Sequence, residues 1–84
     1  MSTVEKIIKT EPMADVISVF ALAFHPMRID QMYARYQKDT PHFVFLEIYK
    51  SLLRDGVLAH DEHGKTIKGP NWTPPAFMTD KRYE

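Results

Sequence analysis

The sequence predicts a mainly α-helical domain in which three helices are followed by a small β-hairpin. Apolar residues recur at helical spacing in three successive segments of the chain. The third segment begins behind Thr40-Pro41 and ends at Gly56, which are residue types that commonly start and stop a helix. Two β-like runs, 57–60 and 65–68, then flank a polar turn. A chain of 84 residues is long enough for one such domain.

The first helix is expected to open at Glu11-Pro12, behind Thr10 as its cap, and to continue to Phe24. Its apolar residues cover nearly the whole circumference, which is typical of a buried helix. The residues before it, 1–12, are predicted to be an N-terminal arm. This arm is expected either as a short helix or as an extended segment that packs on a partner. The domain itself is expected to span residues 13–68.

The second helix is expected to be short. His25-Pro26 is predicted to break the first helix, because the residue before a proline is driven towards extended backbone. Residues 27–29 are then expected as an extended link. The second helix follows over residues 30–36, and residues 37–39 form the turn that leads to Thr40.

The third helix has a buried face that is centred on Tyr49. At about 100° per residue, four other apolar side chains fall within roughly 60° of that centre. These predicted core residues are Phe45, Leu46, Leu52 and Leu53. The remaining side chains are expected to point outward: Phe43, Val44, Glu47, Ile48, Lys50, Ser51 and Arg54.

The C-terminal residues 69–84 are predicted to be an extended, proline-rich tail. Trp72 and Phe77 are expected to anchor this tail against the domain. The polar residues 78–84 are expected to fray.

The order helix, helix, capped helix and hairpin resembles a winged helix-turn-helix domain. The resemblance is carried by the third helix, by the junction Leu52-Leu53-Arg54-Asp55-Gly56-Val57-Leu58 and by the hairpin behind it. It covers residues 13–68. Proteins of this superfamily usually bind duplex DNA with the third helix in the major groove and the hairpin as a wing.

The resemblance implies a small, dimeric, DNA-binding transcription regulator of the kind carried by bacteria, phages or plasmids. The residues that it assigns to bases or phosphates on the third helix are Lys50, Ser51 and Arg54. Those that it assigns to the phosphate backbone elsewhere are Arg28, Arg35, Lys38 and the wing residues Lys65 and Lys68.

Two observations favour a different function, recognition of a protein partner. The chain has 11 basic and 11 acidic residues, whereas proteins built to neutralise phosphates are usually basic. The outward face of the third helix is also largely apolar, although base edges call for hydrogen-bonding side chains. The residues expected in a partner or homodimer interface are Phe43, Val44, Glu47, Ile48 and Trp72.

Three explanations of that apolar face remain open from the sequence. The arm or the Trp72 tail could cover it, a second copy or a partner protein could bind it, or it could contact DNA directly. In the second case the domain would be an inhibitor, an immunity-type protein or an adaptor.

Catalysis and cofactor chemistry are not expected. The chain has no cysteine and only three glycines, so it lacks thiolate ligands and a glycine-rich phosphate loop. His60 and His63 flank two carboxylates, but a solvated hairpin tip is favoured over a metal site because no further ligands complete four. We therefore expect a cytoplasmic protein without a metal, a cofactor, a small-molecule substrate or a membrane span.

Overall fold

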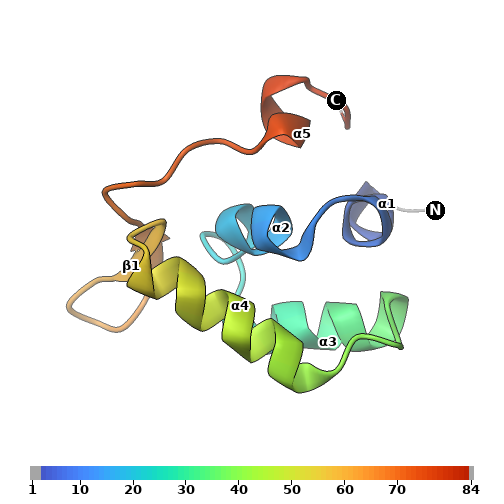
Figure 1. Ribbon diagram of the computed structural model, residues 1–84, viewed down its shortest axis with the longest axis horizontal. Coiled ribbons are helices and arrows are strands. Elements are labelled where there is room, and N and C mark those ends of the chain that lie inside the picture. The colour runs from blue at the N-terminus through green and yellow to red at the C-terminus, as the bar shows by residue number, and fades with distance from the viewer. Residues whose placement is uncertain (1–2, 84) are drawn as a thin grey trace.

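The protein is described by a computed structural model that covers residues 3–83 (Figure 1). It is mainly helical and carries one antiparallel two-stranded hairpin, as predicted. The elements in chain order are α1 (Thr3–Thr10), α2 (Met13–Phe20), α3 (Pro26–Tyr36), α4 (His42–Arg54), β1 (Leu58–His60), β2 (Thr66–Lys68) and α5 (Ala76–Thr79).

The N-terminal arm is a helix and belongs to the core. Ile7 and Ile8 are buried, and α1 contacts both α2 and α3. Of the two alternatives for this segment, the short helix is therefore confirmed for residues 3–10. Met1 and Ser2 lie outside the described residues.

Helix α2 forms the centre of the core, where Val16 and Ile17 are fully buried. It ends at Phe20, four residues before the predicted end at Phe24. The amides of Leu22 and Ala23 donate to carbonyls only three residues back, so the chain tightens into turns. The prediction failed because apolar spacing continues through a segment whose backbone has already left the helix.

Helix α3 begins four residues earlier than predicted. His25 is its N-cap, with Nδ1 accepting the backbone N–H of Met27 at 3.1 Å, and Pro26 occupies the first turn. A proline there is favourable because its missing N–H would have no partner within the helix. The extended link predicted over residues 27–29 is therefore wrong, and Ile29 is a buried core residue of α3.

Helix α4 ends as predicted but starts differently. Gly56 has a φ of +78°, and the amide of Val57 donates to the carbonyl of Leu52. At the other end, Pro41 is the N-cap and no side chain caps the helix. The predicted Thr40 cap is wrong. His42 Nδ1 instead lies 2.8 Å from a carboxylate oxygen of Asp30, which joins the start of α4 to α3.

The buried face of α4 is turned towards Ile48 relative to the prediction. Phe45, Tyr49 and Leu52 are buried, and Ile48 packs against the core. Leu46, predicted as a core residue, is 37% exposed. The reason is that α2, α3 and β1 all contact α4, and their combined position rotates its buried face away from Leu46.

The hairpin pairs Leu58 with Lys68, Ala59 with Ile67 and His60 with Thr66. At its turn, one carboxylate oxygen of Asp61 accepts the backbone amides of His63 and Lys65. The hairpin is fixed to α4 by the hydroxyl of Thr66, which lies 2.6 Å from the hydroxyl of Tyr49.

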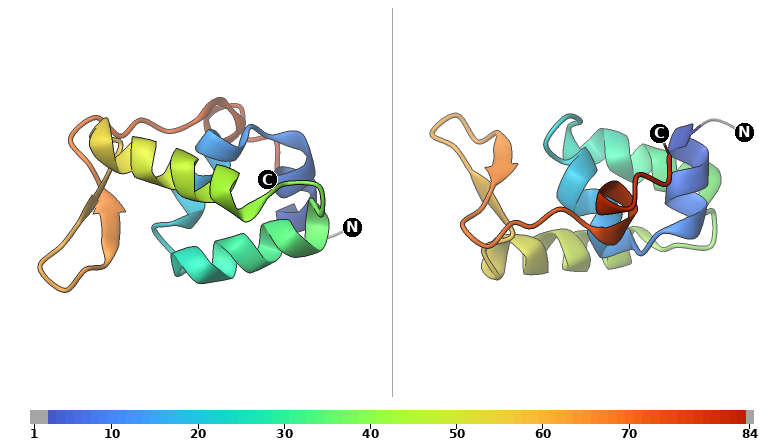
Figure 2. Two further views of the ribbon diagram at one scale, coloured as in Figure 1. Left: turned by 60° about the horizontal axis from the view of Figure 1, so that its bottom comes forward. Right: turned by 90° about the horizontal axis from the view of Figure 1, so that it is seen from above.

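The C-terminal tail runs from the hairpin back over α2 towards α1 (Figure 2, right). Trp72 Nε1 donates to the carbonyl of Ser18 at 2.8 Å, and Phe77 is buried, so both predicted anchors are confirmed. The tail is not extended throughout, because α5 forms one turn of helix around Phe77.

The end of the tail is held in place, against the expectation that residues 78–84 fray. The Arg82 guanidinium lies 2.9 and 3.0 Å from the two carboxylate oxygens of Glu11, and the Tyr83 hydroxyl donates to the same carboxylate at 2.7 Å. The Glu11 side chain is almost fully buried by these contacts. Glu84 lies outside the described residues.

We predict that Gly69→Ala destabilises the fold much more than Gly64→Ala. A Cβ on Gly69 would overlap the carbonyl oxygen of Gly56, which is a backbone atom and cannot move aside as the end of a side chain could. We expect a loss of roughly 3 kcal/mol, at the upper end of the cost of overpacking. Gly64 has a φ of +80° with open space around it, so an alanine there should cost only about 1 kcal/mol of strain. Urea unfolding followed by circular dichroism measures both values, and equal losses would contradict this packing.

We predict that Tyr33→Phe stabilises the protein by about 1 kcal/mol. The Tyr33 hydroxyl is buried and has no hydrogen-bond partner among the described residues. Burial also raises the pKa of the Tyr33 phenol, so ionisation of this group does not affect stability well below its ordinary pKa of about 10, and the folded state loses stability as the pH rises above that value. The variant should therefore lose less stability than the wild type when unfolding is repeated at alkaline pH. Tyr49→Phe is the control, because it removes a hydroxyl that is bonded to Thr66 and should destabilise.

Candidate functional site

The most prominent surface feature is a strip along the exposed side of α4. It consists of Phe43, Leu46, Glu47 and Lys50, which we call the α4 strip. These residues are spaced i, i+3, i+4 and i+7, so they share one face of the helix. Phe43 is 61% exposed and Leu46 is 37% exposed, and Glu47 and Lys50 are also exposed. The strip therefore presents two adjoining apolar side chains with one charge of each sign beside them.

The rotation of α4 about its own axis is fixed by Tyr49. The rings of Phe45 and Tyr49 stack with their centroids 6.1 Å apart on the buried side. The Tyr49 hydroxyl is in turn bonded to Thr66 and lies 3.2 Å from His60 Nε2. Because these contacts hold the buried side against the hairpin, the α4 strip is held outward.

The predicted interface residues only partly coincide with this strip. Phe43 and Glu47 are exposed as predicted. Val44 and Ile48 are half-buried, and Ile48 packs against the core, so it is not an outward residue. Trp72 is half-buried and its indole N–H is bonded to α2. Leu46 was missed, because the sequence places it within the arc that an isolated helix would bury.

Neither the N-terminal arm nor the tail covers the apolar part of the strip. Phe43 and Leu46 keep their exposure in the presence of all the described residues, α1 and the tail included. The first of the three explanations is therefore excluded for Phe43 within residues 3–83, whereas Val44 and Ile48, the other two apolar residues of the predicted face, are half-buried. Contact with a protein or with DNA remains.

The residues of α4 predicted to bind DNA differ in their exposure and in the partners that they already have. Lys50 is exposed. Arg54 is exposed and lies beside Asp55, with Nε 3.3 Å from a carboxylate oxygen. The hydroxyl of Ser51 donates to the carbonyl of Ile48 within the helix, and the residue is half-buried. Ser51 is therefore poorly placed to contact a base.

The basic residues outside α4 lie on separate elements. On α3, the Arg28 guanidinium lies 5.5 Å from the ring of Phe24, and that of Arg35 lies 5.6 Å from the ring of Tyr36. Lys38 is exposed in the turn before α4.

The two wing lysines also differ in their surroundings. Lys65 is exposed on the hairpin, whereas the ammonium of Lys68 stacks 4.2 Å above the ring of Trp72. The segments that carry the predicted DNA contacts of α4 and the hairpin also carry exposed carboxylates, namely those of Glu47, Asp55 and Glu62. The cationic residues are therefore interrupted by negative charge.

Neither a metal-binding cluster nor a membrane-spanning helix is found among residues 3–83. Between residues 3 and 83, no three side chains of the types that bind metals come together around one point. No helix in that range has the length and apolar character needed to cross a bilayer.

Comparison of this chain with protein-family models, with curated proteins and with solved structures finds no match. Its function is therefore inferred from the chemistry of its surfaces.

Proposed function

We propose that this chain is a small protein-recognition domain that binds a partner through the α4 strip. The observation that carries the proposal is the exposure of Phe43 and Leu46 one turn apart on the same helix face. An amphipathic helix that offers anchors at i, i+3, i+4 and i+7 is suited to an apolar groove on another protein.

We also propose that the architecture is of the winged helix type. The order α2, α3, α4 and hairpin supports it, as do the contacts of α4 with α2, with α3 and with β1. In such a domain α4 is the helix that is presented to the binding partner. The proposed fold and the proposed function thus use the same helix.

The chemistry of the strip favours protein over DNA. Removing apolar area from water is favourable by about 25 cal/mol per Å² before the costs of association are subtracted, whereas the side chains of Phe43 and Leu46 have no donor or acceptor to offer a base edge. The Glu47 carboxylate, which is exposed beside them, would be repelled by phosphates. The hydroxyl of Ser51, the one neutral polar group predicted to contact DNA on this helix, is bonded within α4.

The partner should have an apolar groove with charges that complement those of the strip. A basic group is expected opposite Glu47 and an acidic group opposite Lys50. These exposed charges would set orientation and specificity, while the two apolar side chains supply most of the affinity.

We predict that Phe43→Asp and Leu46→Asp each weaken partner binding by at least about thirtyfold, as expected for hot-spot residues. Partners are isolated with the wild-type chain and then purified, and their affinities are measured by calorimetry. Both side chains are exposed, so the variants should unfold at nearly the wild-type urea concentration. Met27→Asp is the matched control, because Met27 is 67% exposed on α3 and lies outside the strip.

Three outcomes decide this assignment. A partner that binds the wild type and Met27→Asp but neither strip variant, with a negative heat-capacity change, supports it. A partner that binds both strip variants with the same affinity as the wild type contradicts it. Sedimentation that shows a dimer of the wild type and a monomer of Leu46→Asp would identify the partner as a second copy.

DNA binding is the second candidate function, and one observation favours it. Lys50 and Arg54 are exposed on α4 and Lys65 is exposed on the hairpin, the positions from which a winged helix contacts DNA. Any such binding would be mainly electrostatic, since Phe43 and Leu46, the apolar residues of the same helix face as Lys50, cannot form hydrogen bonds with base edges.

We predict that a labelled DNA duplex shows no binding at low salt in fluorescence anisotropy. If DNA binding were the function, the logarithm of the affinity would fall with the logarithm of salt concentration, with a slope of about −0.9 per phosphate contact. Lys50→Ala would then reduce that slope by about one contact. A salt-dependent affinity that Lys50→Ala weakens and the uncharged Leu46→Ala leaves unchanged would replace the protein-recognition proposal.

A further inference from the structure

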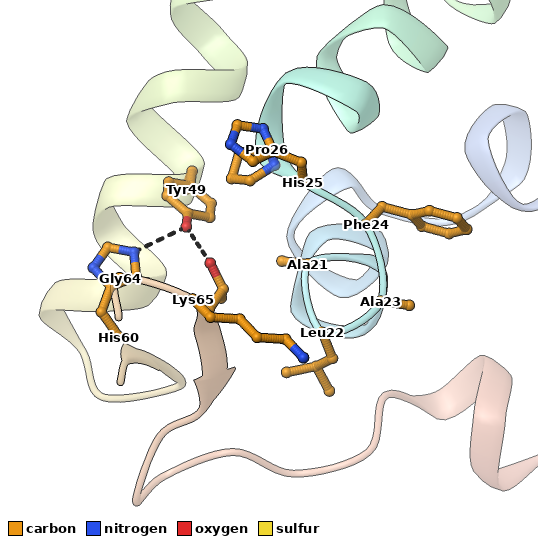
Figure 3. Close-up of a pocket in the computed structure, with 11 residues that line it drawn as sticks. Ala21, Leu22, Ala23, Phe24, His25, Pro26, Tyr49, His60, Gly64 and Lys65 are labelled. Carbon is orange, nitrogen blue, oxygen red and sulfur yellow. Dashed lines mark hydrogen bonds between the residues drawn. The ribbon is translucent and has the colours of Figure 1, made fainter. Parts of the chain in front are cut away.

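A cleft of about 450 Å³ lies between the connection from α2 to α3, the buried side of α4 and the hairpin (Figure 3). Its size falls within the range of about 300–1,000 Å³ that is usual for small-molecule sites. Tyr49 contributes to its wall from the buried side of α4, and none of the four residues of the α4 strip lines it. Its chemistry is therefore separate from the proposed partner surface.

One wall of the cleft is apolar. It is formed by the turns after α2 and by the first residue of α3, and its members are Ala21, Leu22, Ala23, Phe24 and Pro26. Beside it, the Arg28 guanidinium lies against the Phe24 ring. A flat or aliphatic part of a ligand would make dispersion contacts with this wall, and its apolar surface would be removed from water.

The opposite wall carries polar groups and comes mainly from the hairpin. Tyr49 and Thr66 are only 9% and 5% exposed, and their hydroxyls are 2.6 Å apart. When His60 carries its proton on Nε2, it donates a hydrogen bond to the Tyr49 oxygen, and the Tyr49 hydroxyl donates in turn to the Thr66 oxygen. The hydroxyl hydrogen of Thr66 then remains available to donate to a ligand. This wall can therefore supply a nearly buried donor.

Two further donors line the same cleft. His25 Nδ1 accepts the backbone N–H of Met27, so its proton is on Nε2, which can donate to a ligand. The Lys65 side chain extends from the hairpin towards Leu22, across the opening (Figure 3). Lys65 thus places a positive charge where the apolar and polar walls meet.

The cleft contains no negative charge. None of the described residues that line it is Asp or Glu, although the chain has as many acidic as basic residues. The amides at the start of α3 are already used, since that of Met27 bonds His25 Nδ1 and that of Arg28 bonds the carbonyl of His25. The charge available for a ligand is therefore mainly the single ammonium of Lys65, which matches a singly charged anion.

We propose that this cleft binds a small organic carboxylate with an apolar body. The carboxylate is held by the Lys65 ammonium and by the donors of Thr66 and His25. The apolar body lies along Ala21 and Leu22 (Figure 3). A phosphate monoester offers the same kind of oxygens, but its second charge would meet no second cation of the wall.

The proposal is tested on the whole chain labelled with ¹⁵N, by following amide chemical shifts during titration with phenylacetate. We expect saturable shifts at residues 21–25 and 64–66 at millimolar concentration. Phenylacetamide, which has the same shape without the charge, should bind about fivefold more weakly, and so should phenylacetate to Lys65→Gln. Lys68→Gln is the matched control on the same hairpin, because its ammonium stacks on Trp72 and does not line the cleft.

Each outcome decides the proposal. Equal affinity for phenylacetate and phenylacetamide overturns the role of charge. Shifts without saturation, or shifts centred on the α4 strip (Phe43, Leu46, Glu47 and Lys50), overturn the site. Tighter binding of phenyl phosphate than of phenylacetate identifies a phosphate site and overturns the carboxylate assignment.

Discussion

The hydrogen bond between the Tyr49 and Thr66 hydroxyls is the contact on which the rest of the structure depends. Both groups are nearly buried, so each hydroxyl satisfies the other away from water. The bond fixes the hairpin against α4 and sets the rotation of α4 about its axis. Together with the packing of α2 and α3 on α4, this interaction leaves Leu46 facing solvent and makes the buried side of the helix at Tyr49 part of the wall of a cleft.

A second constraint is the small size of the chain, which recruits both ends of the sequence to the core. An isolated domain of residues 13–68 would lose Ile8 and Phe77 from the hydrophobic core. Small domains bury a modest fraction of their surface, so such additions matter. The buried Glu11 carboxylate, which Arg82 and Tyr83 satisfy, closes this arrangement. The arm and the tail thus complete the fold and leave α4 uncovered.

What could be predicted from sequence was the chemistry of short segments. Gly56 was found because a positive φ after a helix favours glycine, which is a local requirement. Leu46 was misplaced because its burial depends on where α2, α3 and β1 meet α4. Arg82 and Glu11 are 71 residues apart, and no local pattern joins them. The strip was therefore predicted in part, while the cleft, which needs three distant segments, could not be predicted.

The neutral net charge first weighed against DNA binding, but its distribution is more informative than its sum. Net charge governs long-range attraction, whereas binding at short range depends on which charges share a surface. The α4 strip holds a carboxylate and an ammonium beside two apolar side chains, and the cleft on the other side of α4 holds cationic and neutral donors without a carboxylate. A single helix thereby separates a mixed surface suited to a protein from an acid-free one suited to a small anion. Because the two surfaces share only the backbone of α4, each can be altered by substitution while the other is preserved.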